Sequence, residues 1–174
     1  MKLKSILLVF ALALPVSIFV FLYMFGENKF EVPIYFREFV TAPNGCDRTY
    51  EVPYKVDQSL IPLNGTTILF FASGLSQKAL RESTFQIKRV SNELHAPLNL
   101  TLVSMDSIGY GDLDKFVKLE AGAYEEESSC VFMAESNRLV LVDSLKQIRG
   151  FYKEGSMKEV DRLILELKIL LNEY

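Results

Sequence analysis

A run of 21 residues without a charged side chain, from Ser5 to Phe25, is the feature that most limits what this chain can fold into. A helix of that length matches the hydrocarbon core of a bilayer, which is about 30 Å thick. We therefore predict a transmembrane helix within residues 1–25 and a separate folded part after it. A cleaved secretory signal is the competing interpretation, because Lys2 and Lys4 precede the run as they would in a signal.

The surroundings of the run favour an anchor that stays attached. The Ala-x-Ala sequence at residues 11–13 lies inside the apolar run and not at its end, where a signal would be cleaved. The positive-inside rule keeps Lys2 and Lys4 in the cytoplasm. This predicts a single-pass membrane protein that contacts the lipid bilayer through residues 5–25. Its N-terminus would be cytoplasmic, and its C-terminal domain would be periplasmic or otherwise extracytoplasmic.

The charge of the exported part excludes some partners. The whole chain carries a net charge of −3, so removing Lys2 and Lys4 leaves −5 for the remainder. The acidic run Glu125–Glu127 adds to this charge, and we expect it to be a solvated loop. Because no basic patch suited to nucleic acid is present, we predict no nucleic-acid partner. Phosphate loops, hydrolase triads and paired glycosidase carboxylates also have no support in the sequence.

The chain has two cysteines, Cys46 and Cys130, which would face an oxidising compartment in the predicted topology. An even number of cysteines there is compatible with one structural disulfide. In the chain-entropy model, closing a loop of this length stabilises a fold by roughly 4–5 kcal/mol. Two other interpretations stay open, namely a slow thiol–disulfide couple and two free thiols. The spacing alone does not show that the two sulfur atoms meet.

The order of the remaining elements predicts an α/β fold. Residues 66–72 are typical of a buried strand, and a helix capped by Ser73 or Ser76 should follow and run to about Leu94. We then expect a strand at 98–105, a short helix at 112–122, strands at 130–133, 138–143 and 147–152, and a long helix at 156–172. Before the first strand, short extended pieces are expected at 33–39 and 49–56.

This order joins a parallel half to an antiparallel half, which is the thioredoxin-like arrangement of a central mixed sheet flanked by helices. We accordingly divide the chain into three parts. The transmembrane anchor occupies residues 1–25, a linker or β-extension occupies 26–60, and the thioredoxin-like domain occupies 61–174.

The C-terminal third resembles the SCO/SenC family. The resemblance is carried by the segments Arg138-Leu-Val-Leu-Val-Asp143, Ile148-Arg-Gly-Phe-Tyr152 and Glu159-Val-Asp-Arg-Leu-Ile164. SCO/SenC proteins are thioredoxin-like, membrane-anchored copper chaperones that help to assemble the CuA centre of respiratory oxidases. The resemblance implies the same fold over residues 61–171, and a protein partner in respiratory-complex assembly.

The residues that carry the family's chemistry are replaced in this chain. Its Cys-x-x-x-Cys copper and redox motif would fall at Gly74 and Lys78, and its histidine ligand near Glu135. We therefore expect a degenerate site with no metal, no cofactor and no catalytic residue. A small anion could still bind the helix end through Ser73, Gly74, Ser76 and Lys78, although helix capping by a serine is the simpler interpretation.

Three functions from different classes follow. The first is a non-catalytic, membrane-anchored binding or scaffold protein that faces the periplasm and is linked to respiratory oxidase assembly. The second is a thiol–disulfide oxidoreductase that uses Cys46 and Cys130. The third is a small-anion or metal-sensing module built on residues 73–78 together with Glu135 and Cys130.

Overall fold

The structure is a computed structural model that describes residues 3–25, 31–95, 97–106, 115–134 and 138–171. The chain forms two compact units, Met1–Glu31 and Val32–Tyr174. The first unit contains helix α1 (Leu3–Phe25), which includes Pro15. Among the residues described, no helix has both the length and the apolar character that crossing a membrane requires.

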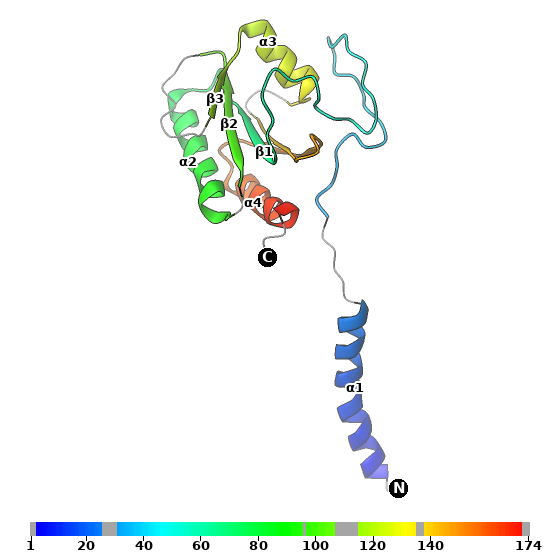
Figure 1. Ribbon diagram of the computed structural model, residues 1–174. Coiled ribbons are helices and arrows are strands. Elements are labelled where there is room, and N and C mark those ends of the chain that lie inside the picture. Colours follow the sequence, from blue (N-terminus) through cyan, green and yellow to red (C-terminus); the bar gives the residue numbers. More distant parts are fainter. Residues whose placement is uncertain (1–2, 26–30, 96, 107–114, 135–137, 172–174) are drawn as a thin grey trace. The chain divides into compact units, whose positions relative to one another are not determined.

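The second unit is built around a five-stranded mixed sheet in the order β3-β2-β1-β4-β5 (Figure 1). Strands β1 (Thr67–Phe71), β2 (Asn99–Ser104) and β3 (Lys115–Lys118) run parallel to one another. Strands β4 (Arg138–Val142) and β5 (Ile148–Lys153) form an antiparallel hairpin, and β4 pairs antiparallel with β1. The parallel half and the antiparallel half confirm the predicted thioredoxin-like fold.

Two amphipathic helices cover one face of this sheet (Figure 1). Helix α2 (Gln77–Glu93) follows β1, and helix α4 (Met157–Leu171) ends the described chain. Each buries one stripe of apolar side chains at helical spacing, because the apolar residues recur every three to four positions. The stripes consist of Leu80, Ile87 and Val90 on α2, and of Val160, Leu163, Ile164 and Leu167 on α4. The predicted long C-terminal helix is therefore confirmed.

The opposite face of the sheet is covered differently. Residues 32–61, which we call the strap, contain no regular helix or strand, yet they bury Val32, Tyr54, Val56 and Ile61. Helix α3 (Ala121–Glu125) and the π-helix η1 (Glu126–Val131) complete this layer. The extended pieces predicted at 33–39 and 49–56 thus belong to the strap and do not form strands.

Hairpin strand β5 contains a bulge that ties it to the start of the strap. The pairing register shifts between Leu141 and Val142, and Arg149 is the extra residue. A bulge re-aims the side chain of its extra residue. The Arg149 guanidinium pairs with Asp143 Oδ2 at 3.1 Å and donates a hydrogen bond to Val32 O at 2.6 Å.

Two predicted elements are wrong. Residues 115–118 form strand β3 and not part of a helix, because their backbone pairs with β2 and sheet hydrogen bonds decide the structure of so short a segment. The strand predicted at 130–133 overlaps η1, where Phe132 N donates to Glu127 O, five residues back. Short apolar runs do not distinguish a strand from a buried helical turn.

Candidate functional site

The resemblance places the thiols of the SCO/SenC family in the turn between β1 and α2. In this chain the first polar residue of that turn, Ser73, makes contacts inside the domain. Ser73 is buried, and its Oγ accepts a hydrogen bond from Met105 N at 2.8 Å and lies 3.3 Å from Ser104 Oγ. Its backbone N–H donates to Tyr124 Oη at 3.2 Å. The Ser73 hydroxyl therefore fastens the ends of β1 and β2 together.

The other residues of the predicted anion site lie nearer to solvent. Gly74 is exposed and has a φ of 79°, in the left-handed region that favours glycine. Ser76 is the N-cap of α2, and its Oγ accepts from Ala79 N at 3.2 Å, which confirms capping by a serine. Lys78 is exposed, with Nζ 3.9 Å from Glu82 Oε1. Glu135 lies outside the described residues, and the anion site stays a prediction.

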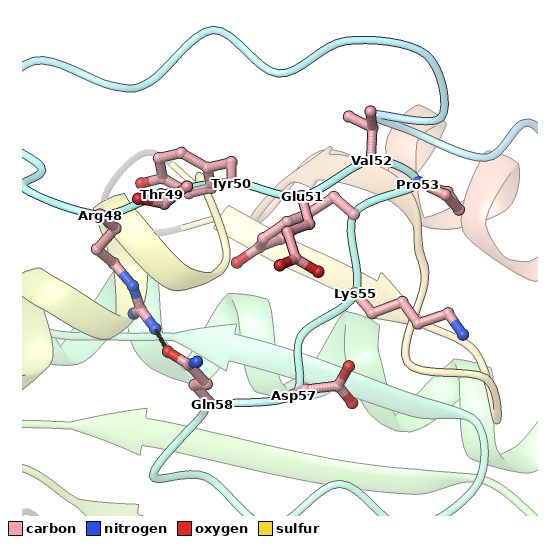
Figure 2. Close-up of a pocket in the computed structure, with 10 residues that line it drawn as sticks. Arg48, Thr49, Tyr50, Glu51, Val52, Pro53, Lys55, Asp57 and Gln58 are labelled. Carbon is pink, nitrogen blue, oxygen red and sulfur yellow. Dashed lines mark hydrogen bonds between the residues drawn. The ribbon is translucent and has the colours of Figure 1, made fainter.

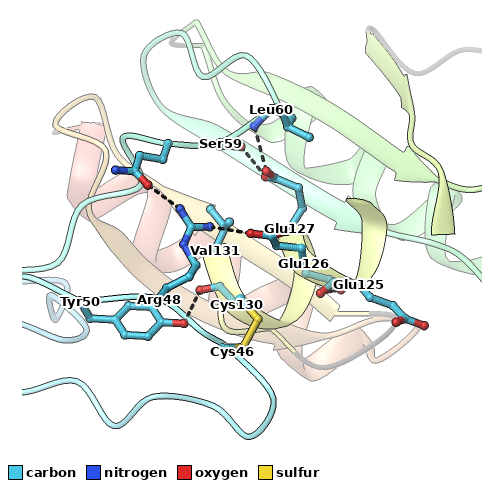
Figure 3. Close-up of polar contacts among 12 residues, drawn as sticks. Cys46, Arg48, Tyr50, Ser59, Leu60, Glu125, Glu126, Glu127, Cys130 and Val131 are labelled. Carbon is cyan, nitrogen blue, oxygen red and sulfur yellow. Dashed lines mark hydrogen bonds and ion pairs between the residues drawn. A yellow bond between two sulfur atoms is a disulfide. The ribbon is translucent and has the colours of Figure 1, made fainter. Parts of the chain in front are cut away.

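Cys46 and Cys130 form a disulfide, which confirms the predicted bond, and the interpretation as two free thiols is wrong. Their Cα atoms lie 5.5 Å apart although 84 positions separate them in the chain. Cys46 belongs to the strap and Cys130 to η1 (Figure 3). The bond therefore attaches the irregular layer of the domain to its π-helix. A structural or a redox-active role for this bond stays a prediction.

Two tyrosines of the strap bind the same end of η1, and Figure 3 shows the first of them, Tyr50. Tyr50 Oη donates to Cys130 O at 3.0 Å, and Tyr54 Oη donates to Val131 O at 2.7 Å. Burial raises the pKa of Tyr54 to about 12. Burial also raises the pKa of Tyr50, and the nearby Arg48 guanidinium opposes this in part. Both phenols therefore stay protonated donors at neutral pH.

The acidic run was expected to be solvated, and for its third residue this is wrong. Glu127 is 2% exposed, whereas Glu125 and Glu126 are exposed. Glu127 Oε2 accepts from Ser59 Oγ at 2.6 Å, and its Oε1 accepts from Leu60 N at 2.9 Å. A carboxylate can be buried when donors replace its water, and the strap supplies two donors here.

A polar hollow of ≈ 510 Å³ lies against strap residues 48–58 (Figure 2). Arg48 borders it and donates from Nη2 to Gln58 Oε1 at 2.8 Å, while its Nη1 lies 3.6 Å from Glu126 Oε1. Every lining residue comes from this one segment of the strap. Among the described side chains, no three His, Cys, Asp or Glu residues are grouped as they would be around a metal ion.

Sequence reasoning did not identify the contacts between the strap and η1. The alternation of Tyr50, Val52, Tyr54 and Val56 was a usable signal, because it indicates a segment with one buried side. Tyr54 and Val56 are indeed buried, whereas Val52 is exposed. No pattern in the sequence indicated that Glu127 would be their neighbour.

Known proteins resemble this chain only distantly and only in structure. No family model matches the chain, and no curated protein matches it. A solved structure of BsSco, a member of the Sco family of cytochrome c oxidase assembly proteins, is 13% identical with a TM-score of 0.47, covering 63% of this chain and 82% of that one.

Two further solved structures show a similar level of likeness. A SCO1/SenC family lipoprotein from Bacillus anthracis is 10% identical with a TM-score of 0.46, covering 62% of this chain and 82% of that one. A thiol:disulfide interchange protein from Bacteroides sp. is 12% identical with a TM-score of 0.44, covering 63% and 74%. At these values the likeness carries no conclusion about function. The order and pairing of the strands make the chain a thioredoxin-like α/β protein, and solved structures similar to it include SCO/SenC proteins.

Proposed function

We propose that this protein is a non-catalytic, membrane-anchored binding or scaffold protein. Its thioredoxin-like domain would face the periplasm, with a role linked to respiratory oxidase assembly. The observation that carries the proposal is the use of the β1–α2 turn. Its first residue, Ser73, is committed to internal hydrogen bonds, and both cysteines are joined elsewhere, between the strap and η1.

The position of the two cysteines supports a non-catalytic role. Thiol chemistry is favoured at a helix N-terminus, where free N–H groups and the macrodipole lower the pKa of a thiol. Cys130 lies instead near the C-terminal end of the helical segment made of α3 and η1, where the dipole disfavours a thiolate. Cys46 lies in the irregular strap. Neither cysteine lies at a helix N-terminus, which supports the non-catalytic proposal.

An exchange assay tests the absence of catalysis. The full chain and a Cys46→Ser/Cys130→Ser variant would each be given a model disulfide substrate and a reductant. We expect the two proteins to give the same background rate. We also expect a reduction potential below about −300 mV for the Cys46–Cys130 bond, as for structural disulfides in exported proteins. Turnover that depends on the cysteines would establish the oxidoreductase function instead.

The membrane part of the proposal rests on the uncharged run Ser5–Phe25, whose described side chains from residue 10 to residue 24 are exposed and mostly apolar. Flotation with lipid vesicles and intact mass measurement test it together. We expect the unprocessed chain to float with the vesicles and to resist extraction by alkaline carbonate. A shortened chain that has lost the run, or one that stays behind in solution, would identify a cleaved signal or an unanchored protein.

The anion- or metal-sensing function is tested by thermal unfolding. A ligand that binds only the native state stabilises it by RT ln(1 + L/Kd), where L is the free ligand concentration, so the unfolding temperature rises with the logarithm of the ligand concentration above Kd. Sulfate, phosphate, Cu(I) and Cu(II) are the informative ligands. Lys78→Ala is the matched variant, because its side chain is exposed and its loss should leave the fold intact. If none of the four ligands raises the unfolding temperature, the sensing function is excluded.

A further inference from the structure

The strap combines one covalent link with several non-covalent contacts, and this suggests a device. We propose that strap residues 37–61 form a cover latched by the Cys46–Cys130 disulfide, which a dithiol reductant opens while the sheet stays folded. The inference rests on the proposed function in one respect. The disulfide is reduced once each time the strap opens, and it does not act as a turnover catalyst.

The strap is built like a cover. Tyr54, Val56 and Ile61 are buried against the apolar side of the sheet that faces away from α2 and α4. The segment has no hydrogen-bonded helix or strand of its own. Segments of this kind belong to the low end of local stability, because few backbone hydrogen bonds must break together for them to open.

Backbone strain lies where the strap is attached. The described residues other than glycine with a left-handed backbone are Phe36, Met133 and Lys146, with φ values of 57°, 51° and 62°. Phe36 O accepts from Tyr54 N at 3.0 Å, and Lys146 O accepts from Val56 N at 2.9 Å.

Met133 lies two residues after Val131, whose carbonyl accepts from Tyr54 Oη. Such conformations persist where the surrounding structure enforces them. The hairpin turn holds Lys146 through its hydrogen bonds to Asp143, whereas Phe36 is held by the hydrogen bond that its carbonyl accepts from Tyr54 within the docked strap. Opening the strap would let Phe36 relax.

The strap meets η1 through polar and apolar contacts. Two phenol hydrogen bonds, the two donors on Glu127 and the ion pair of Arg48 with Glu126 hold it there once the disulfide is broken. The buried side chains of Tyr54, Val56 and Ile61 belong to the same apolar cluster as Val131. The disulfide also closes a loop across 84 positions, so that breaking it restores conformational freedom to the strap. Relief of strain at Phe36 and regained freedom favour opening, whereas these polar contacts and the burial of Tyr54, Val56 and Ile61 oppose it.

The redox step balances with a dithiol as reductant. One reductant thiolate attacks Cys46 or Cys130, the protein S–S bond breaks, and a mixed disulfide forms. The second reductant thiol then attacks this mixed disulfide and leaves as the oxidised, cyclic reductant. Two electrons pass to the protein, and both protein sulfurs end as thiols after taking up protons.

Amide hydrogen exchange on the full chain, in detergent, tests the latch with dithiothreitol as the probe. In the reduced protein we expect the amides of Tyr54, Val56 and Leu60 to exchange on the order of 100-fold faster than in the oxidised protein. The amides of β1 and β4 should change by less than about threefold. Unchanged protection of the strap would overturn the proposal. So would equal loss of protection in the strap and in β1, because the disulfide would then support only the whole fold.

Two substitutions at one position test the strain separately. Phe36→Ala and Phe36→Gly both remove the Phe36 ring, but glycine alone relieves the left-handed backbone. We expect the reduced Phe36→Gly protein to open its strap about tenfold less than reduced Phe36→Ala. Equal exchange in the two variants would refute a role for strain. The thiol-exchange assay reports on the proposed function independently, since turnover would refute that function and leave the exchange result standing.

Discussion

Gly150 allows no side chain, because the ring of Tyr152 lies over it on the same side of β5. A Cβ atom placed on Gly150 would lie 2.3 Å from Tyr152 Oη and 2.6 Å from Cζ. The ring cannot move aside easily. It is 1% exposed, its hydroxyl donates to Glu166 Oε2, and the Arg162 guanidinium carbon lies 4.6 Å from the ring centroid.

The expected cost of Gly150→Ala follows from these contacts. Overpacking of a filled core costs about 1–3 kcal/mol. If the ring shifts to make room, it also loses its hydrogen bond to a carboxylate, worth about 1.5–3 kcal/mol, and its contact with Arg162, worth about 0.5–1 kcal/mol. We therefore expect the free energy of unfolding to fall by at least about 3 kcal/mol, a large part of the 5–15 kcal/mol typical of a domain.

Urea unfolding followed by circular dichroism measures this effect, and Gly122→Ala is the matched control. Gly122 lies in α3, and a Cβ there would meet no atom within 4 Å. Alanine at this position should leave stability unchanged or raise it by about 0.5–1 kcal/mol. In a Tyr152→Leu background, Gly150→Ala should cost much less, because the obstructing ring is gone. A Gly150→Ala protein within about 1 kcal/mol of the wild type would refute the reasoning.

Three other substitutions test the site. Burial raises the pKa of Tyr54 to about 12, so the stability that its protonated phenol contributes is complete below pH 10 and is lost as the pH rises to 12. In alkaline denaturation, wild-type stability should therefore fall by about 2–3 kcal/mol more than that of Tyr54→Phe. Parallel pH curves for the two proteins would contradict this. Gly74→Cys should lower the free energy of unfolding by about 1–2 kcal/mol, because a side chain is strained on the left-handed backbone of Gly74. A thiol at the position where the SCO/SenC resemblance places the first cysteine therefore carries a penalty. Gly74→Ala should show the same loss in urea unfolding. Glu127→Ala should destabilise the protein by about 1.5–3 kcal/mol, because it leaves Ser59 and Leu60 without their acceptor. The control Glu125→Ala changes an exposed residue and should stay within about 0.5 kcal/mol of the wild type. Equal effects of the two substitutions would show that burial of Glu127 is unimportant.

The parts of the fold that could be predicted are those with a strong local pattern. Residues 66–72 were expected to form a buried strand, and β1 is completely buried. The helical repeat after Ser156 and the hairpin at 138–152 were equally clear, and both are present. Each of these segments is specified by side chains close together in the sequence, so that their spacing alone indicates which side is buried.

The parts that could not be predicted depend on partners far away in the chain. Lys115–Lys118 carries too few residues to show a period, and its pairing with β2 makes it a strand. Glu127 looks like one of three solvated carboxylates until the donors of Ser59 and Leu60, more than 60 positions earlier, are brought to it. The disulfide could be suggested from two cysteines, but the contacts that surround it could not.

The bulge at Arg149 also determines how a pull on the chain would enter the domain. Tension applied ahead of Val32 first reaches the hydrogen bond from Arg149 to the Val32 carbonyl and then the one from Tyr35 N to Ile148 O. Both bonds attach to β5, an edge strand whose partner β4 lies next to the centre of the sheet. Arg149 is held in turn by Asp143, which also accepts from the backbone of the hairpin turn. A pulling force from the N-terminal side therefore acts on the β4–β5 hairpin first, and it reaches the disulfide at Cys46 only after these two hydrogen bonds have broken.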